Sequence, residues 1–269
     1  MKRTLRAIRF WFAAGALVAG VAAPSRAGVI SKADNADPLN LPTSWTNGVA
    51  PGAGDVAAWD SALANRTYTL GADLSWLGLA ITTDPGGNLA FSSGNLLTLG
   101  SEGMTTTPNR TITLSNGMAL NADQTWKISS GILIPQGGLA LNGHTLTLSG
   151  GATKQFKAMI TGPGDIITTQ GTLNLSGTGS LASDADLVFK DAGSLSVDKD
   201  VVSSTQRVLS KSMTFFDGRA ATIRGSSKAH VAMTNQNELA LGRGGQSRIS
   251  VSQQGYHATL WSGSLELAP

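Results

Sequence analysis

The chain has 269 residues and a formal net charge of +3 at pH 7, with 33 Gly and no Cys. The absence of Cys excludes disulfides, Cys-ligated zinc, iron–sulfur centres and thiol chemistry. Only 14% of the residues are charged, against a usual fraction of about 25%. This composition argues against a charged, disordered chain and favours an all-β protein with many tight turns.

Residues 1–27 have the pattern of a secretory signal peptide. A basic start precedes an uncharged apolar run of 14 residues, Phe10 to Ala23, which Pro24 ends. Ser25 and Ala27 place small residues at positions −3 and −1 of the expected cut, and a second small-residue site at Ala23 leaves the cut open by a few residues. The run is shorter than the roughly 20 residues of a transmembrane helix. We expect export and cleavage, with an uncleaved membrane anchor as the alternative.

The basic charge of the precursor belongs to this segment, which holds five basic residues and no acidic one. Removing these five of the 20 basic residues leaves 15 against 17 acidic residues, a formal charge of −2. Nucleic acid is therefore not an expected partner. The five residues are Lys2, Arg3, Arg6, Arg9 and Arg26.

Short triplets that alternate apolar, polar and apolar residues recur after the leader, each beside Gly, Asn or Asp. Such triplets predict strands with one buried face, separated by turns. Two further strands are expected over Thr125–Ile128 and Ile132–Ile134. The triplets are Tyr68–Leu70, Leu97–Leu99, Ile112–Leu114, Leu146–Leu148, Leu173–Leu175 and Leu195–Val197.

The triplets predict a β-solenoid over residues 67–200. One short rung cannot bury its apolar face alone, whereas coiling the chain stacks each rung on the last. The centres of the triplets recur only loosely, and a β-sandwich or jelly roll is the competing architecture. Residues 28–66 are expected to cap the first rung, with Trp45 and Trp59 beside proline-rich turns. Residues 201–269 are expected to form further, less regular β-strand repeats.

Several segments carry a family resemblance that covers roughly residues 45–269. Together they resemble proteins with autotransporter-associated β-strand repeats. The resemblance implies a right-handed parallel β-helix passenger, exported to the bacterial envelope or beyond. The segments are Trp45–Pro51, Gly54–Asp60, Leu70–Leu79, Asp84–Gly87, Ser115–Gly117, Asn121–Trp126, Leu146–Gly150, Gly162–Asp165 and Gly171–Gly177.

The sequence departs from full autotransporters at its end, because it leaves no room for a membrane β-barrel of about a dozen strands. We therefore expect no β-barrel anchor and no transmembrane helix in the mature chain. A naturally short family member and a truncated part of a longer autotransporter both stay open, as do the mode of anchoring and the oligomeric state.

Catalytic and metal sites have weak support in the sequence. Asp55 and Asp60 flank an apolar strand and are candidates for catalysis or calcium binding, although turn and cap roles explain them better. A cluster within Asp184–Asp200 could hold calcium, but its spacing matches neither an EF-hand nor the glycine-rich calcium repeat. A solvated turn face is the expected role of this cluster, and the calcium question stays open. Its carboxylates are Asp184, Asp186, Asp191, Asp198 and Asp200, interleaved with Lys190 and Lys199.

Other side chains add little chemistry. His144, His230 and His257 lie far apart, and His144 is expected in an exposed turn. No Gly-x-Ser-x-Gly elbow is present, and Gly242–Gly245 lacks the Lys-Ser/Thr ending of a phosphate loop. The tryptophans could form an exposed sugar-binding platform, but alternation favours their burial. They are Trp45, Trp59, Trp76, Trp126 and Trp261.

The sequence therefore predicts an exported structural or adhesive β-solenoid of the bacterial cell surface. We expect no catalysis, no cofactor and no metal, and cell-surface glycans or other envelope components as partners. The alternative is a secreted β-helix module that binds or degrades polysaccharide.

Overall fold

The computed structural model describes most of the chain after the leader. Residues 1–26, which hold all but the last residue of the predicted signal peptide, lie outside the described residues, as do parts of the C-terminal third. Side chains are described for residues 27–176, 181 and 186–196. The described residues are 27–176, 181–182, 186–199, 205–216, 220–225, 230–243, 248–251, 257–262 and 265–267.

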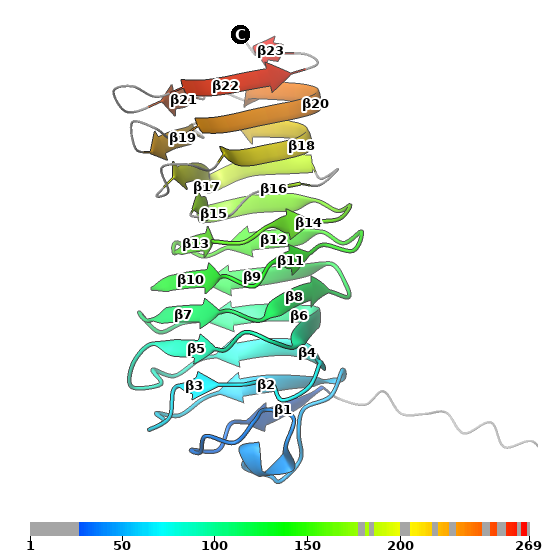
Figure 1. Ribbon diagram of the computed structural model, residues 1–269, viewed down its shortest axis with the longest axis vertical. Coiled ribbons are helices and arrows are strands. Elements are labelled where there is room, and N and C mark those ends of the chain that lie inside the picture. The colour runs from blue at the N-terminus through cyan, green and yellow to red at the C-terminus, as the bar shows by residue number, and fades with distance from the viewer. Residues whose placement is uncertain are drawn as a thin grey trace, which may run out of the picture.

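The described residues form 23 β-strands and one short 3₁₀ helix, η1 (Pro42–Ser44). Figure 1 shows the strands stacked one above another along the long axis, with β1 at one end and β23 at the other. All pairings between the named strands are parallel. This arrangement confirms the predicted all-β solenoid and excludes the sandwich, whose neighbouring strands run antiparallel.

Each turn of the solenoid contributes strands to three stacks, here called faces 1, 2 and 3. Face 1 begins at the end of the solenoid where the N-terminal strand lies. A long strand that rounds a corner contributes one half to each of two faces. Face 1 contains β1 (Gly28–Ser31), β2 (Asp55–Trp59), the second halves of β4 (Leu74–Ile81) and β6 (Leu96–Thr106), β9 (Gln124–Ile128), β12 (Leu146–Ser149), the first halves of β15 (Ile166–Ser176) and β17 (Asp186–Lys199), the second halves of β18 (Thr205–Phe216) and β20 (His230–Arg243), and β23 (Leu265–Leu267).

Faces 2 and 3 are built in the same way. Face 2 contains β3 (Thr67–Tyr68), β5 (Leu89–Phe91), β7 (Thr111–Leu114), β10 (Ile132–Pro135), β13 (Thr153–Phe156), the second halves of β15 and β17, β19 (Ala220–Gly225) and β21 (Arg248–Val251). Face 3 contains the first halves of β4 and β6, β8 (Gly117–Leu120), β11 (Leu139–Ala140), β14 (Ile160–Thr161), β16 (Leu181–Ala182), the first halves of β18 and β20, and β22 (His257–Ser262).

The core is a set of rows in which equivalent inward residues of successive turns stack. Alternation along each strand puts every second side chain inside, so a row is occupied by the same kind of residue turn after turn. On face 1, one such row is buried throughout, with each side chain at most 1% exposed. It contains Leu79, Met104, Trp126, Leu148, Thr168 and Phe189.

The end of the solenoid at β1 is closed by residues that do not belong to a stack. Lys32 forms an antiparallel bridge with Trp45, and the Thr46 amide donates to the Ser31 carbonyl at 3.0 Å. The Trp45 ring lies edge-on against Trp59 at 5.7 Å. Both indoles are buried. Pairing of this kind satisfies backbone groups that would otherwise be open to another chain.

Candidate functional site

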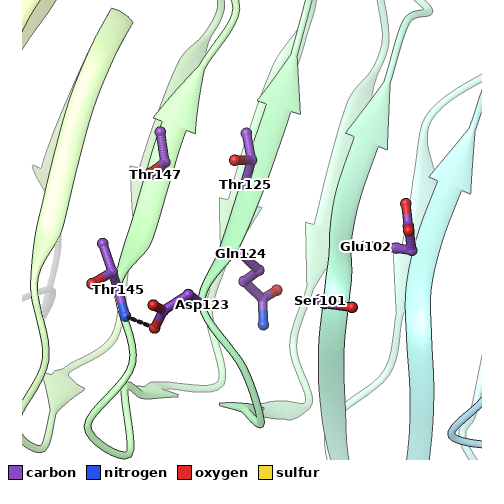
Figure 2. Close-up of a pocket in the computed structure, with 7 residues that line it drawn as sticks. All are labelled: Ser101, Glu102, Asp123, Gln124, Thr125, Thr145 and Thr147. Carbon is purple, nitrogen blue, oxygen red and sulfur yellow. Dashed lines mark hydrogen bonds between the residues drawn. The ribbon is translucent and has the colours of Figure 1, made fainter.

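The outer surface of face 1 contains a shallow hollow of about 530 Å³, here called the polar hollow. It lies across β6, β9 and β12, and Figure 2 shows its side chains in rows along these strands. Its lining offers hydroxyl, carboxyl and amide groups. The lining residues are Ser101, Glu102, Asp123, Gln124, Thr125, Thr145 and Thr147.

The hollow forms where the side chains stacked in an outward row of face 1 become smaller from one turn to the next. Thr147 stacks on Thr125 in this row, and the turns beyond it carry Ile167 and then Val188. In the other direction the row carries Gly103, paired with Gly78. Large apolar side chains are thus replaced by threonine and then by glycine. The loss of side-chain volume leaves the surface hollow.

Gly78 and Gly103 lie where neighbouring atoms leave no room for a side chain. A Cβ at Gly78 would lie 2.7 Å from the Glu102 Cβ, so Glu102 occupies the space that a side chain would need. Gly103 has a φ of +58°, which an L side chain rarely adopts, and its Cα faces the Thr125 carbonyl. The two glycines therefore position Glu102 at the edge of the hollow.

The floor of the hollow is structural. The Gln124 side chain is buried, donates through Nε2 to the Leu99 carbonyl at 2.9 Å and accepts from Trp126 Nε1 at 2.8 Å. Its hydrogen bonds connect the hollow to the core, since Trp126 is an inward residue of the same strand. Gln124 is therefore a positioning group with no free acceptor directed at the surface.

Asp123 lines one side of the hollow, and one of its carboxylate oxygens is used in a hydrogen bond that stabilises the fold. Its Oδ1 accepts from the Thr145 amide at 2.8 Å, the bond drawn in Figure 2, and lies 3.6 Å from Nδ1 of His144. His144 is half-buried in the turn that begins at Asn142, which confirms the expected turn but makes the side chain less exposed than predicted. The second oxygen of Asp123 is free of protein partners among the described residues.

Several groups of the hollow have unused hydrogen-bonding capacity. Within the described part of the chain, the Glu102 carboxylate makes no hydrogen bond or ion pair. The hydroxyls of Ser101, Thr125, Thr145 and Thr147 likewise make none. The hollow therefore presents both donors and acceptors to solvent.

The carboxylates that the sequence singled out have structural roles. Asp60 accepts from the Ser31 hydroxyl at 2.6 Å, and Asp55 accepts from the Gly52 amide at 3.0 Å. These bonds match the expected cap and turn roles. Asp84 accepts from the Gly86 amide at 2.9 Å, the expected Asx turn, and forms an exposed ion pair with Arg110 at 2.7 Å that lowers the pKa of this carboxyl.

Turn carboxylates and amides also hold successive turns together. Asp73 accepts from the Leu96 amide 23 residues later, at 2.8 Å. Asn88 accepts in the same way from Thr111, at 3.1 Å. A side chain that accepts from the next turn replaces a backbone partner that the corner lacks. Much of the acidic and amide content of the turns is thus used for stacking.

The carboxylate cluster within Asp184–Asp200, for which the sequence predicts a solvated turn face, is described only in part. Asp184 and Asp200 lie outside the described residues, and the side chain of Asp198 is not described. Asp186 begins β17, and its amide donates to Asp165 Oδ1 at 3.2 Å. Within the described residues, no three His or acidic side chains are grouped as metal ligands. The calcium question therefore stays open.

The structure describes some of the remaining candidates from the sequence, namely four of the five tryptophans, but not the side chains of the others. Trp45, Trp59, Trp76 and Trp126 are each at most 2% exposed, so they form no surface platform. The side chains of Trp261, His230 and His257 lie outside the described ones, as do Gly244 and Gly245 of the Gly242–Gly245 segment. Among the described residues, no helix is long and apolar enough to cross a membrane.

Two lysines are buried, which the sequence did not predict. Lys32 Nζ donates to Asn35 Oδ1 at 2.9 Å and lies 4.8 Å from the centre of the Tyr68 ring. Burial lowers the pKa of Lys32, and nearby carboxylates oppose this effect. Lys154 is 0% exposed on an inward row of face 2 and donates to the carbonyls of Gly150 and Gln170 at 2.6 and 2.9 Å. Burial lowers the pKa of Lys154 from 10.5 to about 8.

The polar hollow was not found by sequence reasoning, because its residues come from three turns. The only signal was the spacing of 22 residues between Thr125 and Thr147, which is one turn of the solenoid. Comparisons of the chain with family models, with curated proteins and with solved structures find no match.

Proposed function

We propose that the chain is exported and acts as a structural or adhesive β-solenoid at the bacterial cell surface, resembling autotransporter passengers. The observation that carries this proposal is the use of the turn carboxylates and amides. Asp73, Asn88 and Asp123 each accept from an amide of the next turn, so they hold the stack together. A stack made in this way suits an extended, stiff body that displays its outer faces.

The signal-peptide pattern of residues 1–27 supports the export part of the proposal. An exported chain without Cys must draw its stability from backbone pairing and a continuous core. The parallel stacks and the buried inward rows provide both. The near-neutral charge after the leader fits a surface that meets uncharged partners rather than phosphate backbones.

A leader fusion tests export. Residues 1–27 joined to an alkaline phosphatase that lacks its own leader should give active enzyme outside the cytoplasm, because that enzyme needs oxidised cysteines. A matched fusion in which Arg3, Arg6 and Arg9 are replaced by Glu should stay inactive. An inactive native fusion would contradict the export proposal.

A turnover assay tests the structural role against the enzymatic alternative. We expect no release of reducing ends when the full chain is incubated with a panel of polysaccharides. Turnover that disappears in Asp55→Asn or Asp60→Asn, while circular dichroism stays unchanged, would overturn the structural proposal. The two variants keep the size of the side chains and one acceptor oxygen, remove the charge and replace the other oxygen by an amide donor.

A further inference from the structure

We propose that the polar hollow binds an uncharged saccharide through the hydroxyl groups of the sugar. This inference rests on the proposed adhesive role and names the ligand class and the place on the solenoid. Its basis is the geometry of face 1, where glycines and threonines replace the apolar outward side chains of the neighbouring turns.

The chemistry of the lining matches sugar hydroxyls, each of which can donate and accept. The Glu102 carboxylate and the second oxygen of Asp123 are acceptors without protein partners among the described residues. The hydroxyls of Thr125 and Thr147 can donate as well as accept. An exposed group that is already hydrogen-bonded within the protein would offer less to a ligand, and these groups have no such bond within the described part of the chain.

The spacing of the rows suits a chain of sugars. Parallel strands lie about 4.8 Å apart, so Thr125 and Thr147 repeat at about that distance along the solenoid axis. Thr145 lies beside Asp123 in the adjoining row. A saccharide lying across β9 and β12 would meet Asp123 and Thr125 in one turn and Thr145 and Thr147 in the next, a step comparable to the length of one pyranose unit.

The negative charge of the hollow favours uncharged over anionic saccharides. The hollow has two carboxylates and no Lys or Arg in its lining. Uronic or sulfated sugars would bring negative charge against Glu102 and Asp123, which costs free energy. A metal bridge that would reverse this preference has no support, since the described residues contain no group of three His or acidic ligands. Uncharged sugars avoid this repulsion.

The removal of the row of hydroxyls tests the site. The full chain, purified after export, is titrated by calorimetry with cellohexaose, laminarihexaose and chitin hexasaccharide, and with hexagalacturonate as the anionic probe. We expect binding of at least one uncharged probe and none of hexagalacturonate. The double variant Thr125→Val, Thr147→Val should bind at least about tenfold more weakly, because valine keeps the shape and removes both hydroxyls.

A matched control keeps the result specific. The variant Thr98→Val, Thr161→Val changes two half-buried outward threonines of face 3 and should bind like the native chain. The variant Glu102→Gln, Asp123→Asn should lose the discrimination against hexagalacturonate. Equal affinity of both valine variants, or no binding of any uncharged probe by a chain with intact β circular dichroism, would overturn the site. Neither outcome bears on export, which the leader fusion measures separately.

Discussion

The turns near β1 and the central turns fill the same kind of interior with different side chains. In residues 28–91 the core is a cluster of aromatic rings, in which Trp59 lies 5.2 Å from Phe91 and 5.8 Å from Tyr68. In residues 96–176 the inward rows are mainly Leu, Ile and Met, with one stacked ring pair, Trp126 and Phe156. Large aromatic side chains thus fill the core near β1, whereas rows of similar aliphatic side chains fill the core of the central turns.

The physical reason lies in what each region packs against. A central turn has a similar turn on both sides, so side chains of similar shape can stack in rows. The first turn has a neighbour on one side only, and large rings such as Trp45 must cover the other side. Aromatic side chains do this well because each buries a large area.

The two buried lysines follow the same division. Lys32, at the closed end, is near Asp34 and Asp37 and faces the Tyr68 ring. Lys154, in the central turns, is held by backbone carbonyls. Near β1, carboxylates thus compensate the charge of the Lys32 ammonium, whereas the Lys154 ammonium in the central turns is stabilised by backbone carbonyl dipoles. The burial of Lys154 is the more costly of the two.

The largest expected effect comes from the aromatic end. Trp59→Ala removes a fully buried ring from contact with Trp45, Trp76, Tyr68 and Phe91 and should cost about 3–5 kcal/mol of unfolding free energy. Urea unfolding followed by circular dichroism measures this loss. The matched variant Trp126→Ala should cost less, because it removes one ring contact instead of four, although it also leaves the Gln124 amide oxygen unpaired; a larger loss there would reverse the comparison.

The second effect is a pH dependence from Lys154. The unfolded chain keeps the proton up to about pH 10.5, whereas the folded chain releases it at about pH 8. The unfolded state therefore binds more protons between these values, and stability rises with pH across this window. Lys154 should contribute at most about 3 kcal/mol to that rise.

Unfolding free energies at pH 8 and pH 10.5 measure the contribution of Lys154. Lys154→Met should flatten the rise, because methionine has no proton to release. Lys32→Met should flatten it less, since Asp34 and Asp37 oppose the lowering of the Lys32 pKa. An unchanged slope in Lys154→Met would contradict the assignment.

A smaller loss of stability is expected from the ring nitrogens of two buried tryptophans, Trp126 and Trp76, of which only Trp126 donates a hydrogen bond among the described residues. Trp126 Nε1 donates to Gln124 Oε1, whereas Trp76 Nε1 has no partner among the described residues. Trp126→Phe should therefore cost about 1–2 kcal/mol more than Trp76→Phe, because it leaves a buried amide oxygen unpaired. Thermal unfolding of both variants tests this, and equal losses would show that the bond adds nothing.

The smallest effect is a gain in the central core. Thr168 is fully buried on face 1, and its Oγ1 has no partner among the described residues. Thr168→Val keeps the shape, removes the unsatisfied hydroxyl and should raise the unfolding free energy by about 1 kcal/mol. Thr125→Val, on the exposed side, should be near neutral. A loss at Thr168 would indicate a partner for its hydroxyl.

The loose spacing of the sequence triplets has a simple cause in the structure. Thr98 lies on face 3, Thr113 on face 2 and Thr147 on face 1. Distances between such triplets therefore mix three stacks. Along a single face the repeat is tighter in the central turns, for example 21 residues from Thr113 to its partner Ile134 and 22 from Thr125 to Thr147, and it lengthens toward the ends, to 27 residues from Gly28 to Asp55 and 28 from Ala220 to Arg248.

The strands that the triplets missed break the simple alternation. β13 carries Lys154 at an inward position, so its sequence does not look like a half-buried strand. β11 and β14 are two residues long, too short to show any period. β4 has small or aromatic residues at several positions where a triplet would show an aliphatic residue.

The sequence by itself determined the fold class, because short alternating strands between turn residues can bury their apolar sides only by stacking. It also determined the turn roles of residues such as Asp84, since Asx turns are local. Only the tertiary structure decided which residues of different turns meet. Lys154 lies inside, and Ser101, Asp123 and Thr145 share one hollow, because the register between turns sets these contacts and no local pattern encodes that register.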